Sequence, residues 1–149
     1  MVVRDFRARR RFGGTLVESA VVLTTLMSFV LGVFEYGRLM MSWNLVNNAA
    51  REGCRYALAN NTSSTISTDV QTLVTGYMGG QTTSFTGFTA TVSGTHLGVS
   101  TTVNNLAPGD LVTVTVSGAY QFMNIIPLIR MPTSMTITSA VTMVCEGGT

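Results

Sequence analysis

The chain has 149 residues, of which 46% are hydrophobic and only 11% are charged, well below the ~25% that is usual in soluble domains. Nine arginines and no lysine stand against seven acids; residues 1–14 carry five of the arginines and one acid, a net +4, so residues 15–149 carry −2 of the total of +2. The basic charge therefore belongs to the N-terminal segment and gives no support for nucleic-acid binding by the remainder, whose low charge favours self-association.

Residues 1–13 are predicted to be a basic leader. Five arginines precede the first apolar run: Arg4, Arg7, Arg9, Arg10 and Arg11. By the positive-inside rule, the N-terminus stays in the cytoplasm and the rest of the chain crosses the membrane. The apolar run that follows lacks the small-residue cleavage site of a secretory signal peptide. The segment is therefore a membrane anchor, or a leader that is cut on the cytoplasmic side.

A single long helix is predicted over residues 14–60, apolar over residues 16–34 and amphipathic beyond. Ser19–Phe34 holds sixteen residues without a charge, Pro, Asn or Gln. At about 1.5 Å per residue this run covers about 24 Å, slightly less than the ~30 Å core of a bilayer. Tyr36 and Trp43 extend the apolar character to an aromatic belt. We expect a membrane span, with a buried core helix as the alternative.

The later part of this helix has an apolar stripe at spacings of three and four residues. The stripe consists of Leu39, Trp43, Val46, Ala50, Cys54 and Ala57. Such spacing places these side chains on one face of a helix. We expect the stripe to pack against the chain's own β-domain; packing against neighbouring helices in a filament is the second interpretation, and it suits the first part of the helix better.

Residues 61–149 are predicted to form a small extracytoplasmic α/β domain. A capping box, Thr68-x-x-Gln71, predicts a short helix that ends at Gly79-Gly80. The hydrophobic period then changes from 3.6 to 2, which indicates three strands, around 88–92, 112–117 and 135–143. The fold class is therefore α+β: a long N-terminal helix packed against a small antiparallel sheet with one short extra helix.

Two connections between the strands differ in composition. Residues 93–106 are small and polar, which predicts a loop with room for one edge strand. Residues 119–132 are unusually apolar, and four of them are too apolar for all to be solvated: Ile125, Ile126, Leu128 and Ile129. We expect them to be buried within the domain, against another subunit or against lipid.

The two cysteines, Cys54 and Cys145, both fall on the extracytoplasmic side of the predicted span. In an oxidising compartment a disulfide between them would close a loop of about 90 residues and contribute up to about 4.5 kcal/mol if unstrained. Two separate buried thiols are the alternative.

No catalytic, metal-binding or cofactor-binding set can be assembled from the few ionisable residues. His96 is the only histidine and lies in a Gly/Ser/Thr segment typical of a surface loop. Asp69 and Asp110 are isolated in the sequence, too few for a calcium site. We therefore expect no enzymatic activity and no cofactor.

Three motifs follow one another along the long helix. Glu18 is the fifth residue after Gly13, at the start of the apolar run; Gly32–Arg38 reads GVFEYGR; and Asn47–Ala57 reads NNAAREGCRYA. Together they resemble the TadE-like family of pilin-related proteins from tight-adherence, or Flp-type, pilus systems. Two residues depart from the family's pattern: Ser19 replaces an aromatic residue, and Cys54 replaces an alanine.

The resemblance implies a pilin-like fold and a type IV pilin-like route of assembly. A prepilin peptidase would cut between Gly13 and Gly14, and the freed helix would leave the inner membrane to pack in an extracellular filament. Glu18 would then neutralise the N-terminus of an adjacent subunit, and Glu35 and Arg38 would be further charges at the packing surface. The implied partners are copies of the chain or other pilins, the peptidase and the assembly machinery.

Two other functions fit the same residues. One is a single-pass membrane-anchored accessory protein that never polymerises. The other is a small secreted domain whose Thr-rich strands bind a surface or a carbohydrate.

Overall fold

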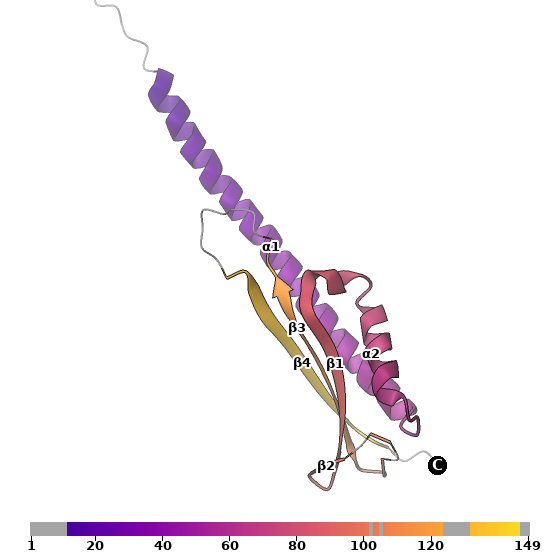
Figure 1. The fold of residues 1–149 in the computed structure, drawn as a ribbon. Coiled ribbons are helices and arrows are strands. Elements are labelled where there is room, and N and C mark those ends of the chain that lie inside the picture. Colours follow the sequence, from indigo (N-terminus) through magenta and orange to yellow (C-terminus); the bar gives the residue numbers. More distant parts are fainter. Residues whose placement is uncertain (1–11, 102, 105, 124–131, 147–149) are drawn as a thin grey trace, which may run out of the picture. The chain divides into compact units, whose positions relative to one another are not determined.

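The structure is a computed structural model that describes residues 12–101, 103–104, 106–123 and 132–146. The arginines of the predicted leader and residues 125–129 of the apolar connection lie outside these residues. The chain divides into two units, Met1–Gly37 and Arg38–Thr149. Helix α1, Phe12–Ala59, runs from the first unit into the second (Figure 1). The two units are described in turn.

The second unit is built on a sheet of four antiparallel strands in the order β2-β1-β3-β4 (Figure 1). The strands are β1 (Phe85–His96), β2 (Val99–Thr101), β3 (Leu111–Gln121) and β4 (Ser134–Val144). Between β3 and β4 every residue pairs in register from Leu111 opposite Val144 to Gln121 opposite Ser134, whereas the pairing of β1 with β3 shifts between Thr86 and Thr89. The predicted α+β class is confirmed.

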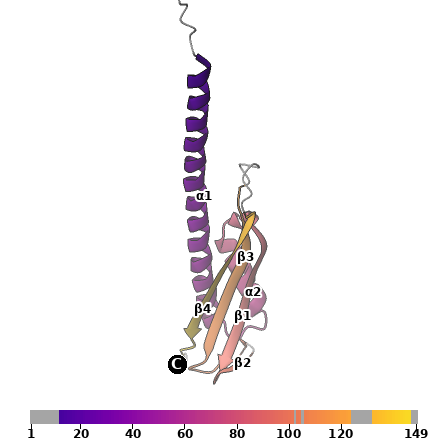
Figure 2. The same ribbon diagram turned by 90° about the vertical axis from the view of Figure 1, so that its left-hand side faces the viewer.

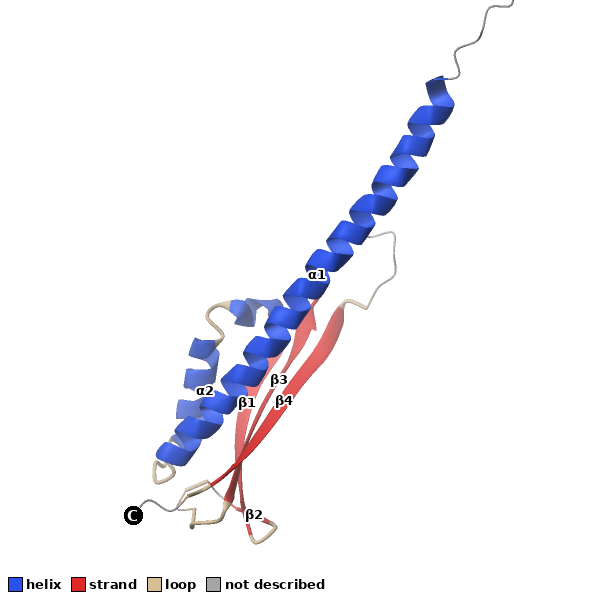
Figure 3. Ribbon diagram, turned by 180° about the vertical axis from the view of Figure 1, so that it is seen from behind, coloured by secondary structure: helices blue, strands red, loops and turns tan. Residues whose placement is uncertain are grey.

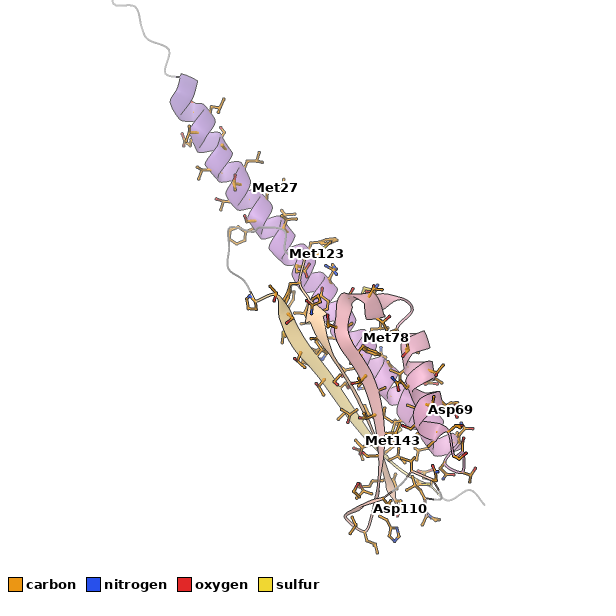
Figure 4. All side chains as sticks on the ribbon, viewed as in Figure 1. Met27, Asp69, Met78, Asp110, Met123 and Met143 are labelled. Atoms are coloured by element: carbon orange, nitrogen blue, oxygen red, sulfur yellow. The ribbon has the colours of Figure 1, made fainter. Side chains whose placement is uncertain are left out.

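The helices of this unit lie on one face of the sheet (Figures 1 and 3). They are the later part of α1, helix α2 (Ile66–Tyr77) and the short 3-10 helix η1 (Gln81–Ser84). Their buried side chains meet alternate residues of β3 in one core, whose largest fully buried members include Val46, Val70, Val74, Val112, Val114, Val116 and Tyr120. Figure 4 shows Met78 in the same layer, and it is completely buried. The later part of α1 therefore packs against the chain's own sheet, as predicted.

The predicted stripe on α1 is confirmed except at one residue. Val46, Ala50, Cys54 and Ala57 are buried, and Leu39 packs against the core from its margin. Trp43 is 39% exposed, so its ring is only partly covered.

The opposite face of the sheet is lined by hydroxyl side chains. Thr113 and Thr142 share a hydrogen bond of 2.8 Å between their hydroxyl oxygens, and Thr89 and Ser117 share one of 3.2 Å. Threonine suits such a position because its branched carbon favours the extended backbone while its hydroxyl stays hydrated. Because apolar and hydroxyl residues alternate along the strands, the hydrophobic core lies on one side of the sheet only.

The predicted capping box of the short helix was wrong. Helix α2 begins at Ile66, so Thr68 and Gln71 lie inside it. Thr65 is the N-cap, and its hydroxyl donates to the Asp69 carboxylate at 2.8 Å instead of accepting from a backbone amide. Ile66 is 3% exposed, and the burial of this side chain favours a start three residues earlier than the capping pattern predicts.

The strands are also longer than predicted. β1 begins before Phe88 and continues to His96, and the expected edge strand within 93–106 is the three-residue β2. Leu97 and Gly98, with φ of 48° and 81°, form the turn between β1 and β2. Two successive positive φ values match the twist of a tight hairpin.

Gly53 permits the close approach of three elements, and its replacement tests the core. A β-carbon built at Gly53 would lie 2.9 Å from Val74 Cγ2, 3.2 Å from Val70 Cγ1 and 3.4 Å from Val114 Cγ1. We expect Gly53→Val to lower the free energy of unfolding by about 1–3 kcal/mol, because the extra methyl groups overpack the core. Chemical denaturation of the full chain in detergent micelles measures the loss.

The matched control is Gly76→Val, since Gly76 is also helical but a β-carbon there meets nothing within 4 Å. An equal loss of stability in both variants would contradict the packing account.

Candidate functional site: the apolar part of the long helix

The first part of α1 exposes large apolar side chains. Leu16, Phe29 and Val33 are each more than 70% exposed. The helix is long and apolar enough to cross a membrane, and the apolar window that meets this criterion has no buried residue. Exposed apolar area costs about 25 cal/mol for each Å² that stays in water. This segment therefore needs lipid or protein around it.

Small residues form a ridge along this part of the helix. Ala20, Thr24, Ser28 and Gly32 recur every four residues, which places them along one row of the helix surface. The hydroxyls of Thr24 and Ser28 donate to the carbonyls of Ala20 and Thr24 at 2.7 and 2.9 Å, so both find partners within the helix. An open groove passes along the ridge. Such a ridge lets another helix approach closely in an apolar medium.

The predicted cleavage residues lie in the first turn of α1. Gly13 and Gly14 both have helical backbone, and Gly14 has no other side chain within 4 Å of the place where a β-carbon would stand. Glu18 follows one turn later and is exposed among apolar neighbours. A carboxylate in that position is costly to bury without a partner. Its role in subunit pairing stays a prediction, as does cleavage.

The other two predicted packing charges, Glu35 and Arg38, are partly exposed. Arg38 belongs to the second unit, where its guanidinium carbon lies 5.8 Å from the centre of the Tyr120 ring. That distance suits a cation–π contact. Arg38 is thus held against the end of β3, and its predicted role between subunits stays a prediction.

The two cysteines are buried in the second unit, and each is a free thiol. The Cys54 thiol donates to the Val112 carbonyl at 3.4 Å, and the Asn61 amide donates to the Cys145 sulfur at 3.4 Å. Burial raises the pKa of the Cys54 thiol, and backbone hydrogen bonds of Met143 and Val114 oppose that rise without cancelling it. The disulfide between Cys54 and Cys145 stays a prediction.

His96 and Asp110 form a polar contact that sequence reasoning missed. Asp110, at the end of the sheet near β2 (Figure 4), places its carboxylate 2.5 Å from His96 Nδ1, and it also accepts the Ala107 amide at 2.8 Å. Its backbone carbonyl accepts the Cys145 amide at 2.7 Å. Asp110 is therefore not isolated: it joins the β1–β2 hairpin, the turn before β3 and the end of β4.

This contact shows no sign of chemistry. Among the described residues, no group of three or more His, Cys, Asp or Glu side chains could hold a metal ion. A buried carboxylate with an amide and one imidazole is a common way to fix a turn. We interpret the pair as structural.

A family model described as TadE-like protein matches residues 13–55 of the chain. The match covers the ridge, Glu18 and most of the stripe, and it confirms the resemblance drawn from the motifs. Helix α2 and the four strands lie outside it. Comparisons with curated proteins and with solved structures gave no match.

The Asp110 contact predicts a pH dependence of stability. Burial pushes the pKa of this carboxyl upward, but the hydrogen bond from Ala107, that from His96 and the charge of His96 outweigh it, so the net pKa is below the ordinary value. A depressed pKa stabilises the fold above the carboxyl's ordinary range, and that contribution disappears as the pH falls through the folded-state pKa. Asp110→Asn is therefore expected to lower the melting temperature at pH 7. Below about pH 4, the gap in melting temperature between the variant and the native chain is expected to become smaller.

Melting curves between pH 7 and pH 2.5 measure that gap. A gap of constant size over this range would show that the carboxylate charge contributes nothing.

The buried thiols predict slow alkylation. With the folded chain, iodoacetamide is expected to modify Cys54 and Cys145 at least about tenfold more slowly than in 6 M guanidinium, because burial keeps the reagent from both sulfurs and also disfavours the reactive thiolate of Cys54. Intact mass measured without a reducing agent also tests the disulfide, which would lower the mass by two hydrogens and leave no thiol to alkylate. Rapid modification of the folded protein would contradict the burial of both residues.

Proposed function

We propose that this chain, whose residues 13–55 match a family model described as TadE-like protein, is a structural subunit of a tight-adherence pilus. The precursor is anchored in the inner membrane by α1, loses its leader between Gly13 and Gly14, and enters an extracellular filament by packing α1 against other pilin helices. The observation that carries this proposal is the exposed apolar surface of residues 14–34 within the matched segment.

The ridge of small residues supports helix packing. In a bilayer the apolar side chains around it are already solvated by lipid, so burial of apolar area alone gives no reason to leave. Close contact along Ala20, Thr24, Ser28 and Gly32 adds van der Waals attraction that lipid tails match poorly, and the hydroxyls enter that contact with their hydrogen bonds already made. The helix is thus suited to exchanging lipid for neighbouring helices.

Glu18 supports the same exchange through its charge. Removal of the leader between Gly13 and Gly14 would create a new α-amino group four residues before it, the arrangement in which a neighbour's amine and this carboxylate can neutralise each other. An ion pair in an apolar setting requires both partners, since either one alone is left desolvated. The carboxylate would then select correctly processed subunits.

The proposed division of labour follows the predicted segments. Residues 1–13 direct membrane insertion and are removed; residues 14–60 anchor and then polymerise; residues 61–149 form the domain at the outside of the filament. The alternative is an anchored accessory protein that keeps α1 in the bilayer. It accounts for the same exposed apolar side chains but gives Glu18 no role.

Glu18→Gln separates these two functions. In cells that assemble the pilus, we expect the variant to reach the membrane normally but to appear in sheared filaments at least about tenfold less than the native chain, because loss of one member of a buried charge pair costs about 2–5 kcal/mol. Quantitative immunoblots of the membrane and sheared fractions measure the ratio. N-terminal sequencing of the sheared chain, expected to begin at Gly14, tests cleavage.

Glu52→Gln is the control, since Glu52 is a partly exposed acid of the same helix whose partner is Arg55, 3.8 Å away. A native chain that never leaves the membrane fraction would favour the anchored accessory instead.

A further inference from the structure

The motif over Asn47–Ala57 divides between two sides of α1. One set consists of small residues that are buried in the core: Ala49, Ala50, Gly53, Cys54 and Ala57. The other set, Asn48, Arg51 and Arg55, is exposed on the opposite side of the helix. Packing against the sheet explains the first set and gives the second set no role.

The exposed set belongs to a longer line of the helix surface, which we call the arginine row: Met41, Asn44, Asn48, Arg51 and Arg55. Spacings of three and four residues alternate along this row, so its members follow one line of the helix, and all of them are exposed. Figure 2 shows this part of α1 alongside the strands. In Figure 3 it lies in front of them, with no described element covering its near side. The arginine row is therefore open to a partner.

The helix itself gives no reason for two arginines in this row. The positions three and four residues from Arg51 hold Asn47, Asn48, Cys54 and Arg55, so no acid pairs with it along the helix. Within the described residues, no ion pair includes Arg51. Like charges one turn apart, such as those of Arg51 and Arg55, destabilise a helix.

Two other stabilising effects are small here. The contact of Arg55 with Glu52 is 3.8 Å long and joins side chains that are 73% and 46% exposed, so water screens it. The helix dipole favours basic residues mainly in the last turn, and the last turn of α1 has none. The two guanidinium groups therefore keep most of their binding capacity for a partner outside the chain.

Two guanidinium groups one turn apart select the chemistry of that partner. Each of them can bind a carboxylate through two parallel hydrogen bonds, and their β-carbons are about 5–6 Å apart. Binding to an anionic membrane uses clusters of about four to eight basic residues, and binding to nucleic acid uses a wide basic patch. The row has only two basic residues, and residues 15–149 carry a net −2. A protein surface with two neighbouring carboxylates fits the row better than either.

We infer that the arginine row binds an acidic surface of a different protein, in which two carboxylates lie one helical turn apart or directly opposite each other on neighbouring strands. The chain's own sequence has no two acids within one helical turn of each other: they are Asp5, Glu18, Glu35, Glu52, Asp69, Asp110 and Glu146. The inference goes beyond the proposed function and does not rest on it, because the row lies outside residues 14–34.

The test uses the full chain in the cells that naturally produce it. A photo-crosslinking amino acid at Asn44 is expected to give one adduct with another protein, and mass spectrometry is expected to place the link beside two neighbouring acids. Arg51→Gln together with Arg55→Gln is expected to reduce the adduct at least about tenfold, because each change removes a charge-assisted contact. Arg51→Glu together with Arg55→Glu is expected to abolish it, and replacement of the partner's two acids by lysine is expected to restore it.

Gln71→Glu is the matched control, because it changes the net charge by the same amount as Arg51→Gln at an exposed residue of α2. It is expected to leave the adduct unchanged. In detergent micelles, the chain with both Arg51→Gln and Arg55→Gln is expected to melt at or above the temperature of the native chain, since the two arginines do not stabilise the helix.

Four adducts would overturn the inference: one with a second copy, one with lipid, one with nucleic acid, and one with a segment that lacks neighbouring acids. The absence of any adduct, or an adduct that survives the two Gln substitutions, would also overturn it. So would an equal loss of the adduct in Gln71→Glu, a failure of the lysine replacements to restore it, or a lower melting temperature of the doubly substituted chain.

Discussion

The apolar surface of α1 is the constraint on which the rest depends. The two parts of this continuous helix present their apolar side chains differently. Residues 38–59 turn Ala49, Ala50, Cys54 and Ala57 toward the sheet and bury them in the chain's own core. Residues 14–34 carry Leu, Val, Phe and Met around most of the circumference and have no such face to turn inward. Each fully buried side chain of this size gains about 1.5–3 kcal/mol, so this part of the helix depends on a surrounding that the domain does not provide.

The same helix shows how side-chain size is matched to the intended neighbour. Against the sheet, Gly53 allows Val70, Val74 and Val114 to reach the helix backbone. Along residues 20–32, the small residues recur every four positions, and three of them, Thr24, Ser28 and Gly32, line an open groove. Small side chains thus permit close contact within the domain at Gly53, and under the proposed function they permit close contact with another helix along residues 20–32.

Sequence periodicity was sufficient to predict α1, the class of the fold and three of the four strands, because these elements are amphipathic with a clear period. It failed where local and tertiary signals compete. Thr68 and Gln71 have the spacing of a cap, but the burial of Ile66 and Met78 sets both ends of α2. β2 carries no apolar alternation, since its three residues are all exposed and it exists only by pairing with β1.

The candidate site was predicted in part, for a similar reason. Glu18 and the motifs of α1 are visible because their spacing lies along one helix. The contact of His96 with Asp110 joins the end of β1 to the residue before β3, fourteen positions away, and no local pattern encodes it. Met143 and Val112, which surround Cys54, likewise depend on the register of β3 with β4, and that register follows from the pairing and not from the composition of either strand.

The chain carries little charge, and hydroxyl groups supply the polarity of one face of its sheet. The hydroxyls on the outer face of the sheet are hydrated or bonded to one another, so that face is polar without carrying a charge. Residues 14–34 of α1 have no equivalent, because their large exposed side chains are apolar. Water solvates the hydroxyl face well and apolar carbon poorly, so covering the apolar segment with lipid or protein gains more free energy than covering the hydroxyl face.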